Sequence, residues 1–497
     1  MVSTVVIIFW SINLKIKASL MARRRRQFKK SPPNKILRVI KPFSEFIQYQ
    51  GSGGIILLVC VVIALLISNS PVGLSYLSLW ETYIGISIGE FSLTKPLVFW
   101  INDLLMAFFF FLIGLEIKRE VLIGELSTPR VALAPIIAAA GGMIVPAALF
   151  LLVNPLGSEG ANAWAIPIAT DIAIALGLLS IFGSRVPTSL KIFLTTLAIA
   201  DDIAGVLVIA LFYTTNLNLL PLLLGLAILA VMVVLNRIGI RRLLVYAVLG
   251  IIVWLQFLVS GVHPTVAGIL IALTIPATTK IDYSEFVVIS SGLVKRIEDA
   301  CAQGAENIDS KSFQETSETL RLACRDAEAP LQLAEHGLAK WVSFAVIPIF
   351  ALANSGIALF ELSISEIFNP IAVGIIIGLT MGKPLGIISF IWIFTRLGII
   401  VLPEGVNWET MIGMAILGGI GFTISTFIAS LSLSGDILMG AKGAILLASF
   451  ISGLIGVSIL RKALRRLEIL SMPYPPVDLG PPNIIKSEVI SESLEQA

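Results

Sequence analysis

Charged residues and cysteines are both scarce in this sequence. Of its 497 residues, 13% are Asp, Glu, Lys or Arg and 57% are hydrophobic, whereas an ordinary soluble domain is roughly a quarter charged. The three cysteines suggest no disulfide framework, and the two histidines, His263 and His336, are too far apart in sequence to suggest a metal motif. The composition is therefore not that of a soluble domain, and we expect no cofactor.

Long apolar runs are the main feature that the sequence does contain. Each run is about 17–25 residues long, which is enough to cross ~30 Å of hydrocarbon. We therefore expect an all-α polytopic membrane protein with about twelve transmembrane helices. These are expected at 54–70, 97–117, 131–153, 164–182, 191–213, 219–236, 243–259, 262–278, 341–359, 370–393, 411–433 and 443–460.

The basic residues predict the orientation, because they gather on the cytoplasmic side of membrane proteins. With an even number of spans both termini share one side, and the outer loops would hold only Lys95 and Lys442. The residues on the other side are Lys118, Arg119, Arg130, Arg185, Lys191, Arg237, Arg241, Arg242, Arg396, Arg461, Lys462, Arg465 and Arg466. Both termini are therefore expected to be cytoplasmic.

Three regions follow from this pattern: a basic N-terminal region (1–50), a transmembrane domain (51–470) and a C-terminal tail (471–497). The basic run at 23–30 is expected to contact anionic lipid, so no nucleic acid partner is expected. The first twenty residues are interpreted as untranslated, disordered or interfacial, with Met21 as a candidate start.

Two loops stand out from the others. The outer loop YIGISIGEFSL (83–93) alternates apolar and small or polar residues around Gly89-Glu90, which indicates a β-hairpin. An irregular loop is the alternative. The cytoplasmic loop 279–338 is a polar insertion with helix-like stretches at 292–303 and 313–327. It lacks a nucleotide-binding loop and is interpreted as a tether or a regulatory appendage.

Acidic residues inside the apolar runs are the strongest functional signal. A carboxylate at mid-bilayer costs about 2.5–3.5 kcal/mol, so such groups normally face a cavity and carry function. Asp201 and Asp202, in LAIADDIAGVLVIALFY, are separated from both ends of their span by apolar residues. Asp171, Lys383 and Asp103 also lie in apolar runs, although Asp103 is near the start of its span.

Adjacent residues on a helix point about 100° apart, so Asp201 and Asp202 cannot face the same way. One can face an ion path while the other meets a fixed partner, and Lys383 is the natural partner because an unpaired ammonium at that depth is costly. The remaining carboxylate can take a proton or a small hard cation, sodium or lithium.

Two spans carry signals of a broken helix. Pro167 and Gly177 interrupt the span of Asp171, and GGIGFTIS (418–425) lies in the eleventh span. Unwound backbone is tolerated in membranes where it lines a cavity. These spans are the middle members of two triplets with opposite orientation, which indicates inverted repeats with two crossing broken helices. For GGIG alone, close helix packing is the alternative.

At these residues the sequence resembles the NhaA family of bacterial sodium/proton antiporters, itself an example of inverted repeats. The resemblance runs from about Ser52 to Leu460, the insertion apart. It rests on the motifs GSGGIILL, WINDLLMAFFFFLIGLEIKRE, WAIPIATDIAIALG, GSRVP, LKIF, LAIADDIAG, SGVHPTVAG, PIFALANSG, GKPLGI, LPEGV and GGIGFTISTFIAS.

The resemblance implies electrogenic, pH-regulated exchange of Na⁺ or Li⁺ for H⁺ across the inner membrane of a bacterium. It implies that Asp201 and Asp202 exchange cation and proton, and that Lys383 pairs with Asp201. Thr170 and Asp171 would belong to the broken fourth helix, where the aspartate offsets helix dipoles and the threonine helps to bind the cation. Asp103 would lie near the outer side.

The resemblance also implies regulation and assembly. The pH-response residues would be Glu116, Arg119, Glu120, His263, Glu335 and His336, and the hairpin near 83–93 would mediate a homodimer. A structural role for His263 and a solvated interface for Glu335 and His336 are the alternatives. The long 279–338 loop and the tails depart from the family pattern and put the pH set-point in doubt.

Two other functional classes were weighed. An intramembrane aspartyl protease needs two aspartates on separate spans, in YD and GxGD settings, and neither setting occurs here. A cation channel would repeat its carboxylate around a symmetric pore. Saturable, proton-coupled flux separates an exchanger from a channel.

Overall fold

The computed structural model describes residues 52–471, apart from 89–90, 159, 215–216, 280, 303–309, 359–368 and 404. This part holds nine helices that are long and apolar enough to cross a membrane, and two more spans if each bent helix pair is counted as one. The shorter apolar helix Pro264–Thr274 lies at the eighth expected span. Each of the twelve expected spans therefore has a counterpart, and the predicted fold class is confirmed.

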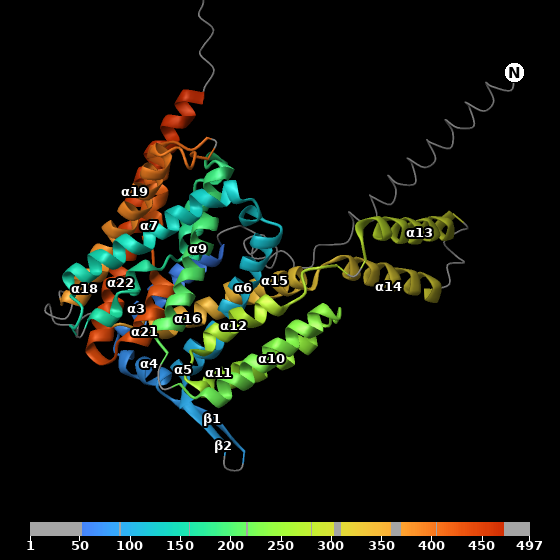
Figure 1. Ribbon diagram of the computed structural model, residues 1–497, viewed down its shortest axis with the longest axis horizontal. Coiled ribbons are helices and arrows are strands. Elements are labelled where there is room, and N and C mark those ends of the chain that lie inside the picture. Colours follow the sequence, from blue (N-terminus) through green and yellow to red (C-terminus); the bar gives the residue numbers. More distant parts are fainter. Residues whose placement is uncertain are drawn as a thin grey trace, which may run out of the picture.

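The helices follow one another through short turns, as expected for a polytopic bundle (Figure 1). In chain order they are α3 (Ser52–Ser68), α4 (Gly73–Trp80), α5 (Leu97–Phe99), α6 (Met106–Leu122), α7 (Pro129–Val153), α8 (Ile172–Ser180), α9 (Thr188–Phe212), α10 (Leu219–Arg237), α11 (Leu243–Ser260), α12 (Pro264–Thr274), α13 (Tyr283–Ala302), α14 (Ser310–Ala327), α15 (Pro330–Trp341), α16 (Ile347–Asn354), α18 (Pro370–Ile377), α19 (Lys383–Arg396), α20 (Trp408–Leu417), α21 (Phe422–Ser432) and α22 (Gly435–Ser471). The π-helical turns Trp100–Leu105, Val342–Val346 and Gly378–Gly382 join α5 to α6, α15 to α16 and α18 to α19.

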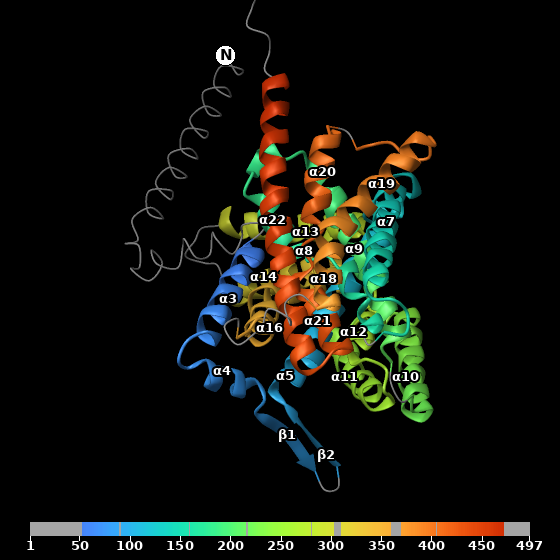
Figure 2. The ribbon, with the colours of Figure 1, turned by 90° about the vertical axis from the view of Figure 1, so that its left-hand side faces the viewer.

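A β-hairpin and a long helix project from opposite ends of the bundle (Figure 2). Strands β1 (Tyr83–Ile88) and β2 (Phe91–Pro96) pair antiparallel, with Tyr83 opposite Pro96. The expected hairpin is thus present and extends three residues beyond the expected range, while its expected turn at Gly89-Glu90 lies outside the described residues. The C-terminal part of α22 projects from the other end.

The polar insertion forms a helical hairpin beside the bundle (Figure 1). The expected helical stretches are confirmed at 292–302 in α13 and at 313–327 in α14, and residue 303 lies outside the described residues. The two helices pack against each other with Leu293 and Ala323 buried. The next span begins at Pro330, earlier than expected, because this proline initiates α15 and Leu331 after it is buried. The segment 330–338 therefore belongs to a membrane-length helix.

The assignment of Lys442 to an outer loop was wrong. Gly435 adopts a φ of 58°, which permits a tight turn directly after α21, so α22 begins well before Lys442. The Lys442 side chain donates a hydrogen bond from Nζ to Oδ1 of Asn354, 3.3 Å away. This lysine therefore joins α22 to the end of α16 instead of marking a loop.

Glycines let α7 and α19 approach closely, and this contact positions Lys383. A side-chain carbon on Gly386 of α19 would collide with the backbone carbonyl of Gly141 on α7. A side-chain carbon on the neighbouring Gly142 would lie 3.8 Å from Cε of Lys383. The lysine stem therefore lies along α7, where no bulkier residue competes for its space.

Candidate ion-binding site

Two broken helices meet in the interior of the bundle. In the first broken helix the backbone is extended at Ala169 and Asp171, just before α8 begins. The second is interrupted between α20 and α21. The backbone N–H of Asp171 donates to the carbonyl of Ile420, 2.6 Å away. The hydroxyl of Ser425 donates to the carbonyl of Ile166 at 2.7 Å. Each break thus supplies partners for polar groups of the other, and the expected crossing is confirmed.

Asp171 holds the crossing together through its carboxylate. Its Oδ1 accepts from the backbone N–H of Ile174 at 3.1 Å, which makes Asp171 the N-cap of α8. Its Oδ2 accepts from the backbone N–H of Thr423 at 3.0 Å, in the first turn of α21. Helix N-termini carry partial positive charge, and one carboxylate therefore compensates two of them.

Lys383, Asp201 and Thr170 form a second polar group beside the crossing. Nζ of Lys383 lies 2.8 Å from Oδ2 of Asp201, and both side chains are completely buried. The same ammonium donates to the carbonyl of Ile168. Oγ1 of Thr170 lies 2.8 Å from Oδ2 of Asp201 and 2.9 Å from the carbonyl of Gly418. The ion pair expected between Lys383 and Asp201 is present.

Asp202 is buried differently from its neighbour. Asp202 is 3% exposed, and neither of its carboxylate oxygens has a hydrogen-bond partner among the described residues. Oδ1 of Asp201 also has none within this part of the chain. An unpaired carboxylate is costly in a low-dielectric interior, and uptake of a proton or a cation offsets that cost. Carboxylate oxygens are ligands that suit a small hard cation.

A cavity of about 810 Å³ lies between α6, α8 and α9, near basic residues Arg119 and Lys191. Its wall on α9 follows a single helix face, at Thr188, Lys191, Ile192, Thr195 and Thr196. These positions are spaced i, i+3, i+4, i+7 and i+8, and the same face continues to 199 and 202. At about 100° per residue, Asp202 lies on this face and Asp201 points away from it.

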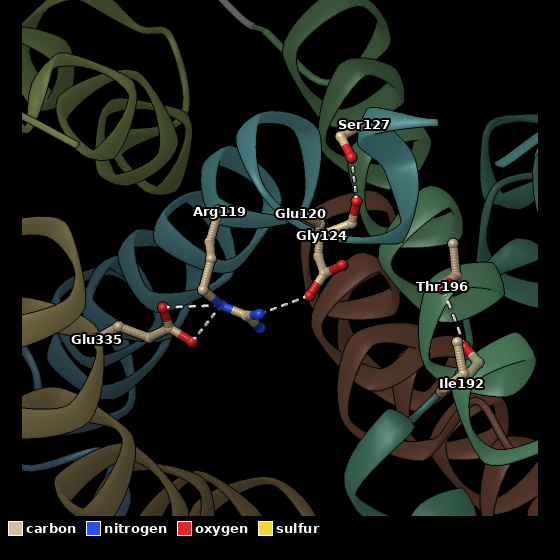
Figure 3. Close-up of polar contacts among 7 residues, drawn as sticks. All are labelled: Arg119, Glu120, Gly124, Ser127, Ile192, Thr196 and Glu335. Atoms are coloured by element: carbon tan, nitrogen blue, oxygen red, sulfur yellow. Dashed lines mark hydrogen bonds and ion pairs between the residues drawn. The ribbon is translucent and has the colours of Figure 1, made fainter. Parts of the chain in front are cut away.

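Arg119 bridges two carboxylates at this end of α6 (Figure 3). Its Nη1 lies 2.8 Å from Oε1 of Glu120, and its Nε donates to both carboxylate oxygens of Glu335 at 3.0 and 3.1 Å. The half-buried Glu116 lies one turn earlier on α6. His336 is exposed and makes no hydrogen bond or ion pair within the described part of the chain. Glu116 interacts electrostatically with Arg119, Glu120 and Glu335, so the structure brings together four of the six residues expected to respond to pH.

Comparisons with known proteins identify the family. A family model described as Na⁺/H⁺ antiporter 1 matches residues 44–460. The Na(+)/H(+) antiporter NhaA of Oleidesulfovibrio alaskensis is 42% identical over 437 residues, which cover 88% of this chain and 97% of the relative. The chain belongs to the NhaA family of Na⁺/H⁺ antiporters.

Other members of this family are equally similar. The Na(+)/H(+) antiporter NhaA 2 of Syntrophotalea carbinolica is 43% identical over 87% of this chain and 99% of its own length. The NhaA protein of Rhodospirillum rubrum is 42% identical over 84% of this chain and 97% of its own length. As a member of the NhaA family, the chain is a multi-pass membrane transporter and not an enzyme, so the protease alternative was wrong, and so was the channel alternative.

Asp103 and His263 meet at a second buried position, a pairing that the sequence does not reveal. Nε2 of His263 lies 3.3 Å from Oδ1 of Asp103, and Nδ1 lies 2.7 Å from Oγ1 of Thr265. The imidazole packs edge-on against Phe427 of α21, with ring centres 5.3 Å apart. The two residues are 160 positions apart, and nothing in either motif indicates that they touch.

The cavity threonines were also not singled out from the sequence. Thr195 and Thr196 immediately precede LAIADD on α9 and line the cavity. The available signal was the spacing of Thr195 from Asp202, because residues seven apart on a helix share a face. That signal becomes informative only when the position of the cavity is known.

Proposed function

We propose that the chain exchanges Na⁺ or Li⁺ for H⁺ at Asp202, with Asp201 and Thr170 contributing oxygens to the same site. The observation that carries this proposal is the pair of buried Asp202 oxygens, which have no hydrogen-bond partner among the described residues. A proton and a small cation each neutralise this carboxylate. Because both use the same oxygens, they compete, and that competition couples their movement.

Lys383 keeps Asp201 in place while Asp202 exchanges its occupant. The ion pair uses Oδ2 of Asp201 and leaves Oδ1 available to a cation bound beside Asp202. Asp171 stabilises the crossing that carries Thr170. The neutralised site then permits the two helix bundles to rock between the two sides of the membrane, as in other transporters built on broken helices.

The exchange is electrogenic if more than one proton moves for each sodium ion. The membrane potential then contributes about 2.3 kcal/mol per net charge per 100 mV. In a bacterial inner membrane with both termini in the cytoplasm, protons would flow inward and drive sodium outward. Sodium and pH homeostasis is the corresponding physiological role.

Everted membrane vesicles test the exchange directly. Addition of Na⁺ to vesicles acidified by respiration should release protons from the lumen, which a fluorescent pH probe detects. We expect Asp202→Asn to abolish this response, because an amide neither ionises nor exchanges a proton. Asp436→Asn is the matched control, since Asp436 is exposed in the first turn of α22. Full exchange by Asp202→Asn would refute the assignment of the site.

The Arg119 cluster supports a proposal for pH regulation, with Glu116, Glu120 and Glu335 around the shared cation. His336, next to Glu335 in the chain, and His263, which lies elsewhere beside Asp103, are proposed as further pH-response residues. In Arg119→Gln the Glu120 and Glu335 carboxylates would face each other without that cation. We expect the pH dependence of exchange to move toward alkaline pH in this variant. Arg321→Gln, which removes an exposed ion pair with Glu318 on α14, is the control. Identical pH profiles for the wild type and Arg119→Gln would count against the cluster.

A further inference from the structure

Thr195 and Thr196 are two hydroxyl-bearing residues of α9 that line the cavity. The hydroxyl of Thr195 donates to the carbonyl of Lys191 at 3.0 Å, and that of Thr196 donates to the carbonyl of Ile192 at 2.9 Å. Figure 3 shows the second of these bonds. A hydroxyl whose proton is engaged in this way offers only lone pairs to a ligand. Such an oxygen accepts a cation and has no hydrogen left to offer an anion.

The two threonines differ in their alignment with Asp202. Thr195 precedes Asp202 by seven residues. The two residues therefore differ by about 20° in direction around the helix axis and by about 10 Å along it. Thr196 precedes Asp202 by six residues and lies about 120° away. On this face Ile199 is the residue between Thr195 and Asp202. Thr195 is therefore the last oxygen-bearing side chain of α9 on the line from the cavity to Asp202.

We propose that Oγ1 of Thr195 coordinates the alkali cation as it passes from the cavity to Asp202. This inference rests on the proposed function, because it assumes that Asp202 is the destination. A cation that enters a buried site loses part of its hydration shell, and protein oxygens replace the lost water. Thr195 supplies one such oxygen one step before the carboxylate. The ligand that this oxygen would bind is a small hard cation, Na⁺ or Li⁺.

The test is the apparent KM of exchange, measured with the purified full chain in proteoliposomes. Thr195→Val keeps the shape of the side chain and removes its oxygen, whereas Thr195→Ser retains the oxygen. We expect Thr195→Val to raise the apparent KM for Na⁺ and Li⁺ about five- to tenfold, as for the loss of one polar contact. Vmax should stay within about twofold, because the interaction concerns binding. Thr195→Ser should behave as the wild type.

Thr214→Val is the matched control for helix effects. The hydroxyl of Thr214 makes the same type of bond, to the carbonyl of Ala210 at 2.7 Å, two residues beyond the far end of α9 and outside the cavity lining. Its KM should equal that of the wild type. If Thr195→Val proves unstable in a thermal melt, Thr195→Ala replaces it in the same comparison.

The outcomes separate this inference from the proposed function. An unchanged KM in Thr195→Val overturns the inference, and so does an equal rise in Thr195→Ser or Thr214→Val, which would indicate a general effect on α9. If the wild type exchanges ions and Asp202→Asn does not, the proposed exchange site at Asp202 remains supported even when the Thr195 inference is overturned. If the wild type carries out no Na⁺/H⁺ exchange, the proposed function itself fails.

Discussion

At the scale of single residues, two adjacent carboxylates acquire different properties from their surroundings. Asp201 is held by Lys383 and Thr170, whereas the oxygens of Asp202 have no partner among the described residues. Removal of one member of a buried ion pair leaves the other charge uncompensated, which costs about 3–5 kcal/mol. The ion pair between Asp201 and Lys383 is thus a structural requirement for the exchange that we propose at Asp202.

We expect Lys383→Ala to lower the melting temperature in detergent markedly, because Asp201 would remain buried without its cation. The double variant Lys383→Met with Asp201→Asn should recover much of the loss, since it removes both charges. Differential scanning fluorimetry measures both effects. A melting temperature for Lys383→Ala equal to that of the wild type would contradict the structural role of the pair.

At the scale of helices, the contact between α7 and α19 determines where Lys383 lies. Gly386 and Gly141 bring the two backbones together, and Gly386 follows the lysine by three positions on α19. Overpacking at such a contact typically costs about 1–3 kcal/mol. A change there should therefore affect both stability and the site.

Gly386→Ala should destabilise the protein and reduce exchange, because its added carbon meets the carbonyl of Gly141. Gly337→Ala on α15 provides the contrast. Nothing lies within 4 Å of a side-chain carbon there, and replacement of a helical glycine by alanine favours the helix by up to about 1 kcal/mol. Melting temperatures that moved in the same direction in both variants would argue against the packing explanation.

At the scale of the whole molecule, two appendages leave the helix bundle in different places. The β-hairpin projects at the end opposite to the free end of α22, and the α13–α14 hairpin extends to the side (Figures 1 and 2). We propose that the β-hairpin joins two copies of the chain, as the family resemblance implies. Its location away from the exchange site means that assembly and transport can be tested separately.

Replacement of residues 85–94 by a short Gly-Ser turn should lower the dimer fraction in mild detergent, while each protomer retains its exchange activity. Deletion of residues 283–327 should leave the dimer fraction unchanged, because it removes the other appendage. Light scattering coupled to size-exclusion chromatography measures both. A hairpin variant as dimeric as the wild type would rule out this interface.

Much of the architecture could be predicted from the sequence because it depends on local properties. Apolar length predicts the spans, proline and glycine patterns predict the two breaks, and alternation predicts the hairpin. Boundaries were less accurate at Pro330 and Lys442, where a helix start depends on a single proline or on a glycine of positive φ. The motifs around Asp202 were distinctive enough to indicate the family.

The amino-acid sequence by itself therefore determined that the chain crosses a membrane repeatedly and that ionisable groups lie within it, because hydrophobicity and charge are properties of each residue. Only the tertiary structure decided which of them touch. Asp103 meets His263, Lys383 pairs with Asp201 and not with Asp202, and Thr195 lines a cavity on the helix face that carries Asp202. These relations arise from the crossing and packing of helices that are distant in sequence, and no local pattern encodes them.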